Sequence, residues 1–310
     1  MGRQFLSGAR LAAVFLAALL AAPLAHADAT DICFNYYNAQ DYARAENEAR
    51  ALLQRGGLDR VGEMLAHLCL GKALSAQGRA RDALPAFQQL EALSQSTKEL
   101  VAAYVWLGSV YQGVGDLDRA ELYDRRALKA ARELGDKSLE ASMLSNLGLV
   151  AQARGDTERA LALYQESLAL QSDGAKKPTI LNNMAVIYLD RKDYAKAVTK
   201  LRQAIEINRK NGDAHSLARY QLNLGDVLRR QGKLKDAEKE LTAGYNAIRL
   251  IGDKSWEAAA CGKLAALSFE KNDVVLGRPW REWGEEGVAL YRAIGDNASA
   301  DALAKIIAQE

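Results

Sequence analysis

The side chains best suited to metal or covalent chemistry in this sequence are Cys33, Cys69, Cys261 and His67. Thiolates and imidazoles are good zinc ligands, so Cys33, His67 and Cys69 could form part of a metal site. A structural zinc site needs four ligands, however, and neither a fourth ligand nor a C-x-x-C pair accompanies these three. We therefore predict no metal site.

The cysteines have two further interpretations. Cys33 and Cys69 are either small buried hydrophobic residues or the two partners of a disulfide bond, which an oxidising compartment would permit. In the second case Cys261 remains a buried free thiol. The sequence leaves both interpretations open.

Catalytic motifs do not occur in the sequence. It contains no G-x-S-x-G nucleophile elbow, no phosphate-binding loop and no H-E-x-x-H motif. Gly113-Val-Gly115 does not follow a predicted strand, so it does not indicate a dinucleotide-binding loop. We predict a protein that is not an enzyme, with no catalytic residues and no cofactor. An enzyme with an unrecognised site is the alternative.

The first 27 residues have the layout of a secretory signal peptide. Two basic residues, Arg3 and Arg10, precede an apolar run from Leu11 to Leu24. The small-x-small sequence Ala25-His26-Ala27 then provides a cleavage site. A membrane-spanning helix needs roughly 20 apolar residues, more than this run supplies. We predict cleavage after Ala27 and export to the periplasm or beyond, with no membrane span in the mature chain; an uncleaved anchor is the alternative.

The balance of charge argues against a nucleic-acid partner. The full sequence has 41 basic and 39 acidic residues and a formal net charge of +2. Loss of Arg3 and Arg10 with the signal peptide leaves equal numbers of basic and acidic residues. Nucleic-acid-binding domains typically carry a clear basic excess, so we predict none here.

A repeated pattern covers the rest of the chain. A tiny residue follows an apolar one at positions 33, 71, 108, 148, 185, 225 and 265, with spacings of 37 to 40 residues. A second small residue recurs twelve positions later, as Ala83 does after Gly71, and in the last copy this rule selects Gly277. Each copy predicts a helical hairpin whose small residues let the two helices pack closely. Gly-Asp turns, such as Gly115-Asp116, would end one helix and cap the next.

These residues resemble the tetratricopeptide repeat, whose pattern reads W-x2-L-G-x2-Y…A-x3-F. Tyr104-Val-Trp-Leu107-Gly108-Ser-Val-Tyr111 and Ala160-x3-Tyr164 carry the resemblance. The longer spacing is similar to the extended repeats of kinesin light chains and Pins-like adaptors. The resemblance implies an all-α fold, a right-handed α-solenoid of about seven helical hairpins. We expect the signal peptide over 1–27, the solenoid over 28–296 and a C-terminal capping helix over 297–310.

The resemblance also implies where a partner binds. First helices line the concave groove of such a solenoid, and the groove usually holds a peptide or a partner helix. Asn146, Asn183 and Asn223 stand two residues before the tiny residue in three successive copies. In the resembling families an Asn there contacts the peptide backbone, because an amide both donates and accepts hydrogen bonds. Bonding within the helix stack, or to water, is the alternative. Asn182 extends the same strip.

Four more side chains are candidates for partner binding. Trp106 is either an aromatic anchor for a partner or a residue of the packing between repeats. Arg219, Arg229 and Arg230 are suited to an acidic ligand. Asp226 stands three and four residues before Arg229 and Arg230, so ion pairs within the helix are the alternative.

The sequence therefore predicts an exported, non-enzymatic scaffold that binds a protein or peptide partner in its concave groove. Assembly of an envelope or secretion complex is the setting that the resemblance favours. A regulatory or sensor subunit that binds a small ligand or a secreted peptide is the alternative. The pattern does not identify the partner or the oligomeric state.

Overall fold

A computed structural model describes residues 27–171 and 177–309 of the chain. These residues form fifteen α-helices. In chain order the helices are α1 (Ala27–Asn38), α2 (Tyr42–Arg55), α3 (Arg60–Ala76), α4 (Ala80–Leu93), α5 (Thr97–Gly113), α6 (Leu117–Glu133), α7 (Lys137–Ala153), α8 (Thr157–Leu170), α9 (Lys177–Asp190), α10 (Tyr194–Asn211), α11 (Ala214–Arg230), α12 (Leu234–Ile251), α13 (Lys254–Lys271), α14 (Trp280–Ala293) and α15 (Asn297–Gln309).

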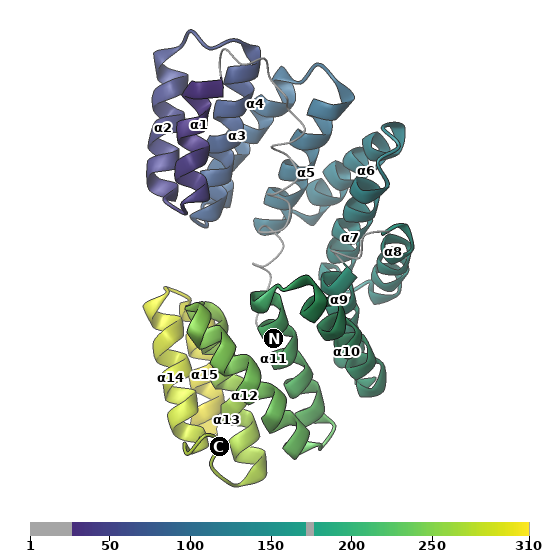
Figure 1. Cartoon of the computed structure of the whole chain (residues 1–310), viewed down its shortest axis with the longest axis vertical. Coiled ribbons are helices and arrows are strands. Elements are labelled where there is room, and N and C mark those ends of the chain that lie inside the picture. The colour runs from purple at the N-terminus through teal and green to yellow at the C-terminus, as the bar shows by residue number, and fades with distance from the viewer. Residues whose placement is uncertain (1–26, 172–176, 310) are drawn as a thin grey trace. The chain divides into compact units, whose positions relative to one another are not determined.

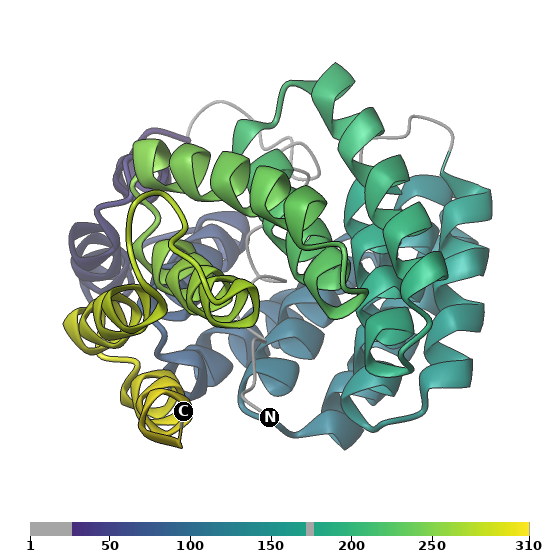
Figure 2. The ribbon, with the colours of Figure 1, turned by 90° about the horizontal axis from the view of Figure 1, so that it is seen from below.

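The helices belong to two compact units that divide between Leu170 and Gln171. The N-terminal unit holds four helical hairpins, from α1–α2 to α7–α8, and the C-terminal unit holds three, from α9–α10 to α13–α14, followed by α15 (Figures 1 and 2). Between residues 27 and 309, gap excepted, the only strand-like pairing is an isolated bridge between Val275 and Arg278. The predicted all-α fold of about seven hairpins is confirmed. Apart from Ala27, the predicted signal peptide lies outside the described residues.

Glycine on the first helix of a hairpin allows the second helix to approach closely. A Cβ atom added to Gly71 would lie 2.6 Å from the ring of Phe87 on α4. One added to Gly148 would lie 2.6 Å from Cε1 of Tyr164 on α8. Any side chain at these two positions would force the helices apart, which confirms the predicted role of the tiny residue.

The turns also follow the sequence prediction. Gly115 adopts a φ of +83°, a conformation that favours glycine, and Asp116 then caps α6 by accepting a hydrogen bond from the backbone N–H of Arg119 at 3.1 Å. Gly252 also has a φ of +83°, and Asp253 caps α13 in the same way. The Gly-Asp pairs therefore end one helix and begin the next.

The prediction for the last hairpin is wrong in its register. Gly277 lies in the loop between α13 and α14 rather than on the second helix. The loop is longer than a Gly-Asp turn because α14 begins only after Pro279, which has no backbone N–H to donate. Gly287 instead faces α13, where an added Cβ would lie 3.2 Å from Cβ of Cys261.

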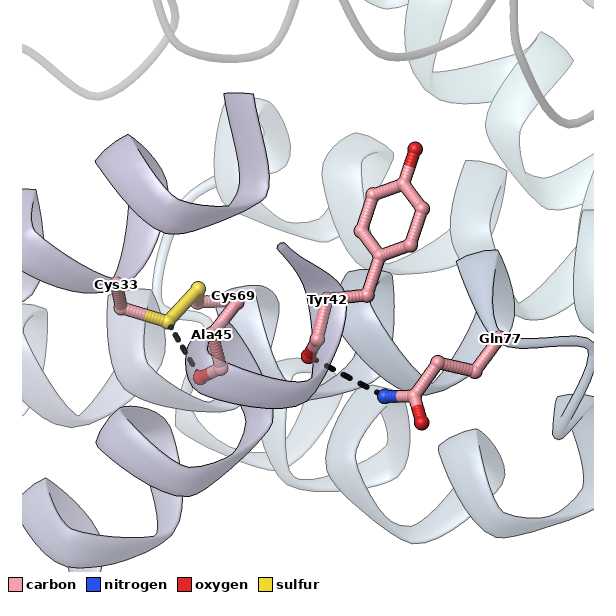
Figure 3. The surroundings of a disulfide bond; sticks show 5 residues. All are labelled: Cys33, Tyr42, Ala45, Cys69 and Gln77. Carbon is pink, nitrogen blue, oxygen red and sulfur yellow. Dashed lines mark hydrogen bonds between the residues drawn. A yellow bond between two sulfur atoms is a disulfide. The ribbon is translucent and has the colours of Figure 1, made fainter. Parts of the chain in front are cut away.

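A disulfide bond joins the first two hairpins. Cys33 on α1 and Cys69 on α3 are bonded, with their Cα atoms 6.4 Å apart and both side chains fully buried (Figure 3). Cys33 Sγ also lies 3.2 Å from the carbonyl oxygen of Ala45 on α2. Cys261 remains a buried free thiol. The structure thus decides between the two interpretations of the cysteines in favour of the disulfide.

Candidate functional site

The first helices of neighbouring hairpins contact one another within each unit. The disulfide joins α1 to α3, and α5 contacts α7, while α11 contacts α13 in the C-terminal unit. Side chains on these helices are therefore brought together from separate repeats. We use the term C-terminal row for the polar side chains of α9, α11 and α13 that carry the candidate site: Asn182, Asn183, Asn223, Asp226, Arg230 and Lys263.

Two of the predicted asparagines are bonded to each other. Asn223 on α11 donates from Nδ2 to Oδ1 of Asn182 on α9, at 2.9 Å. Asn182 is buried, whereas Asn223 and Asn183 are half-buried. Among the residues placed by the structure, none forms a hydrogen bond with the Asn183 side chain. Asn183 and the second N–H and carbonyl of Asn223 are thus the amide groups left to bind a ligand.

Asn146 lies in the N-terminal unit and bonds within the helix stack. Its side chain hydrogen-bonds the carboxyl group of Asp124 on α6, which is 1 % exposed. Burial raises the pKa of Asp124 to about 8, the hydrogen bond from Asn146 opposes that rise, and Glu121 adds to it. Asn146 thus has a partner within the helix stack, and its role in partner binding stays a prediction.

Asp226 lies close to three cations, Arg230 and Lys263 of the C-terminal row and Arg229 beside them. Its carboxylate lies 2.9 Å from Arg229 Nη2, 3.3 Å from Arg230 Nε and 3.6 Å from Lys263 Nζ. Burial alone would raise the pKa of Asp226, but these three cations outweigh it and hold the pKa well below its usual range. The ion pairs within α11 are thus present, and Arg229 also pairs with Glu270 on α13.

The cations around Asp226 differ in their access to solvent. The side chain of Arg229 is 11 % exposed, whereas that of Arg230 is 50 % exposed. Arg230 is therefore the one of the two arginines that a ligand could reach. Asp190 on α9 also attracts Arg230, so the three cations face three acidic residues, Asp190, Asp226 and Glu270. Arg230 supplies the exposed positive charge that is suited to an anionic group.

Trp106 and Arg219 lie in packing positions. Trp106 is 2 % exposed and stacks on Phe87, with ring centroids 5.2 Å apart and planes 5° apart. The ring of Trp106 therefore belongs to the packing between two hairpins, while its indole N–H has no acceptor among the described residues. The Arg219 guanidinium lies 4.6 Å from the ring centroid of Trp256 on the next first helix.

Two buried charged residues were not selected from the sequence. Lys72 on α3 is 7 % exposed and lies among the rings of Phe34, Tyr37 and Trp106. Asp124 occupies the second-helix position that Phe87 fills in the preceding hairpin. The sequence contains a signal for Asp124, because the copies before and after it place Phe87 and Tyr164 at the same register position. The register position of Lys72 is charged in one other copy, at Asp226.

Within residues 27–171 and 177–309 no group of three or more His, Cys, Asp and Glu side chains is arranged to hold a metal ion. Within the same ranges no helix is both long enough and apolar enough to cross a membrane.

The repeats identify the family. A sequence model of the tetratricopeptide repeat matches residues 99–173 and 177–249, and a second model of that repeat matches residues 64–89. The chain belongs to the tetratricopeptide repeat family, as the sequence pattern predicted.

Part of the chain is similar to proteins with a described role. It is 31 % identical to the photosystem I assembly protein Ycf3 of Acaryochloris marina over 123 residues, which is 40 % of this chain and 70 % of that protein. It is 28 % identical to the photosystem I assembly protein Ycf3 of Prochlorococcus marinus (strain NATL2A) over 118 residues, 38 % of this chain and 65 % of that protein. The alignment with the Prochlorococcus marinus protein therefore spans less than two thirds of the length of that protein.

Solved structures share the fold at low sequence identity. The apo form of the quorum sensor NprR from B. thuringiensis superposes with a TM-score of 0.66 and 13 % identity, covering 92 % of this chain and 86 % of that one. BtubC from P. vanneervenii superposes with a TM-score of 0.55 and 22 % identity, covering 74 % of this chain and 93 % of that one. At these identities the likeness concerns the fold alone.

Proposed function

We propose that this protein is a non-enzymatic scaffold that binds a protein or peptide partner along its first helices. The observation that carries the proposal is the C-terminal row. Asn182 and Asn223 are joined across two hairpins, Asn183 has an amide left to bind, and the Asp226 cluster follows on the same helices. Amides bind a peptide backbone whatever its sequence, and the cations favour an acidic side chain or chain end. The name of the Ycf3 relatives, an assembly protein, supports a role in assembling a complex.

The test uses Asn183 and Asn223, because neither supports the hydrophobic core. The partner would be identified by crosslinking in the native compartment and its affinity measured with purified components. The double variant Asn183→Ala/Asn223→Ala should bind about thirty-fold more weakly, since each of the two lost hydrogen bonds contributes about 1 kcal/mol. Asn246→Ala, an exposed asparagine on the second helix α12, is the matched control and should bind normally. Unchanged binding by the double variant would refute the proposed surface.

We also propose that the chain is exported and that its signal peptide is removed after Ala27. The disulfide between Cys33 and Cys69 supports this, because such bonds persist mainly in oxidising compartments. Expression with a periplasmic or secreted readout, followed by mass spectrometry of the mature N-terminus, should find a chain that begins at Asp28. Recovery of the chain in the cytoplasm with Met1 or Gly2 at its start would contradict export.

A further inference from the structure

Lys72 is a buried cation without a neighbouring anion. Two buried carboxylates of the same unit are paired with cations, Glu99 with Arg60 at 3.0 Å and Glu140 with Arg132 at 2.7 Å. Within the part of the chain that the structure describes, no carboxylate oxygen lies within 4.0 Å of the Lys72 ammonium. A buried charge is costly unless it is paired, so this lysine requires an explanation.

Three aromatic rings surround the ammonium. Lys72 Nζ lies 4.3 Å from the ring centroid of Tyr37, 5.4 Å from that of Phe34 and 5.9 Å from that of Trp106. The rings attract the cation through their negative faces, but they do not replace three hydrogen-bond acceptors. All of these side chains come from the first helices α1, α3 and α5.

A second donor in the same cluster also has no acceptor. The indole Nε1 of Trp106 is buried and forms no hydrogen bond with any residue whose placement is described. Buried indole N–H groups usually donate to a partner. The stacking of Trp106 on Phe87 restricts the orientation of the indole, so a small rotation of the ring cannot easily supply an acceptor.

The disulfide holds this cluster together. Phe34 directly follows Cys33, Tyr37 is one helical turn further along α1, and Lys72 is one turn beyond Cys69 on α3. The bond between Cys33 and Cys69 therefore keeps the two rings of α1 next to the lysine. A covalent link beside a buried charge preorganises a site rather than leaving it to side-chain fluctuation.

We propose that Lys72 and the Trp106 indole form a receptor for a carboxylate group on the first-helix side of the N-terminal unit. The two oxygens of one carboxylate would accept hydrogen bonds from the ammonium and from the indole N–H. Phe34 and Tyr37 would form the apolar walls. The inference rests on the proposed function, because the carboxylate is supplied by the bound partner as an acidic side chain or a chain end, or else by a small free acid. Burial lowers the pKa of Lys72 to about 8, and a bound carboxylate would raise it again.

The test is a titration of the whole mature protein with sodium acetate, followed by nuclear magnetic resonance. The lysines of the protein are labelled with carbon-13 and nitrogen-15. Sodium chloride replaces acetate at constant ionic strength as the control. The Lys72 side-chain signal, identified by its loss in Lys72→Met, should shift with acetate to saturation, and the pKa of the amine should rise. In Trp106→Phe the affinity for acetate should fall at least ten-fold, as expected for the loss of one hydrogen bond to a charged group. Lys98→Met, an exposed lysine on α5, should leave the titration unchanged.

Two outcomes would overturn the receptor. One is an equal response to chloride and acetate. The other is a shift of the Lys72 signal that does not saturate with acetate. This outcome is measured on folded wild-type protein, so it does not depend on the stability of any variant. A capped peptide, acetyl-Gly-Asp-Gly-amide, distinguishes the sources of the carboxylate: tighter binding than acetate indicates a partner side chain, and equal binding a small acid. If Asn183→Ala/Asn223→Ala loses its partner while acetate fails to bind, the proposed function stands and the receptor is wrong.

Discussion

Lys72 in the N-terminal unit and Asp226 in the C-terminal unit occupy the same place in their repeats. Each directly follows the glycine of a first helix, Gly71 or Gly225, and the two are 7 % and 6 % exposed. Asp226 is surrounded by three cations from two helices, whereas Lys72 is surrounded by aromatic rings.

The two surroundings have opposite effects on the buried charge. Burial would raise the pKa of Asp226, but Lys263, Arg229 and Arg230 outweigh this effect and keep the carboxylate ionised. The carboxylate in turn offsets the repulsion among the three cations. Burial lowers the pKa of Lys72 with no anion to oppose it. One register position of the repeat can therefore hold a completed ion-pair network or an incomplete one. The incomplete one is where we expect a ligand.

The largest effect should come from the disulfide, which only the N-terminal unit contains among the described residues. Cys33→Ala/Cys69→Ala opens a link between residues 36 positions apart and should lower the stability of this unit by about 4 kcal/mol. Hydrogen exchange followed by mass spectrometry would report each helix separately. Protection should fall in α1 to α4 and remain in α11 to α14, and Cys261→Ala is the control. An equal loss in both units would contradict a local effect.

Removal of the anion from the complete network should be the next largest effect. Asp226→Asn leaves Arg229, Arg230 and Lys263 close together without their central charge and should cost about 3 kcal/mol of unfolding free energy. Because the folded pKa lies below the unfolded one, this stabilisation is complete at neutral pH and is lost as the pH falls below about 4.

Urea unfolding at several pH values would measure this change. Asp236→Asn, at an exposed aspartate on α12, is the matched control and should change stability by no more than about 0.5 kcal/mol. If Asp226→Asn is as stable as the wild type at pH 7, the Asp226 carboxylate does not stabilise the cluster, and solvent alone is enough to accommodate the three cations.

Asp124 should show the opposite sign. Asp124→Leu places an aliphatic side chain where Leu241 packs on Gly225 in another hairpin, and should stabilise the protein by about 2 kcal/mol at neutral pH. Burial raises the folded pKa of Asp124 to about 8, so wild-type stability should fall as the pH rises from about 4 to 8. Thermal unfolding across this range should show a smaller fall in Asp124→Leu; an identical pH profile would contradict the shift.

The smallest effect should come from Lys72 itself. Lys72→Met keeps the length of the side chain, removes the unpaired charge and should stabilise the protein by about 1 kcal/mol at pH 7, since the aromatic rings already offset part of the cost of burial. Burial lowers the pKa of Lys72 on folding, so the gain should be complete below the folded pKa and absent above the unfolded value of 10.5. Chemical unfolding at pH 7 and pH 11 would check this, and a loss of stability at pH 7 would show that the rings stabilise the cation fully.

The sequence predicted the hairpins well and the site only in part. Gly71 and Gly148 were recognisable because a close helix approach excludes every side chain, and that constraint repeats with each copy. The register failed at Gly277, where a longer loop interrupts the repeat. Trp106 was placed on a first helix correctly, but its contact with Phe87 comes from a different hairpin.

The class of fold and the succession of hairpins could be predicted from the sequence, as could the helices on which the candidate residues lie. These follow from local spacing, since a helix shows its buried face at every third or fourth residue. The tertiary structure alone decided which partner each polar side chain meets: Cys69 for Cys33, Asp124 for Asn146, Asn182 for Asn223, and aromatic rings for Lys72. Helical periodicity defines a face, but the packing of separate repeats decides which side chains meet across it.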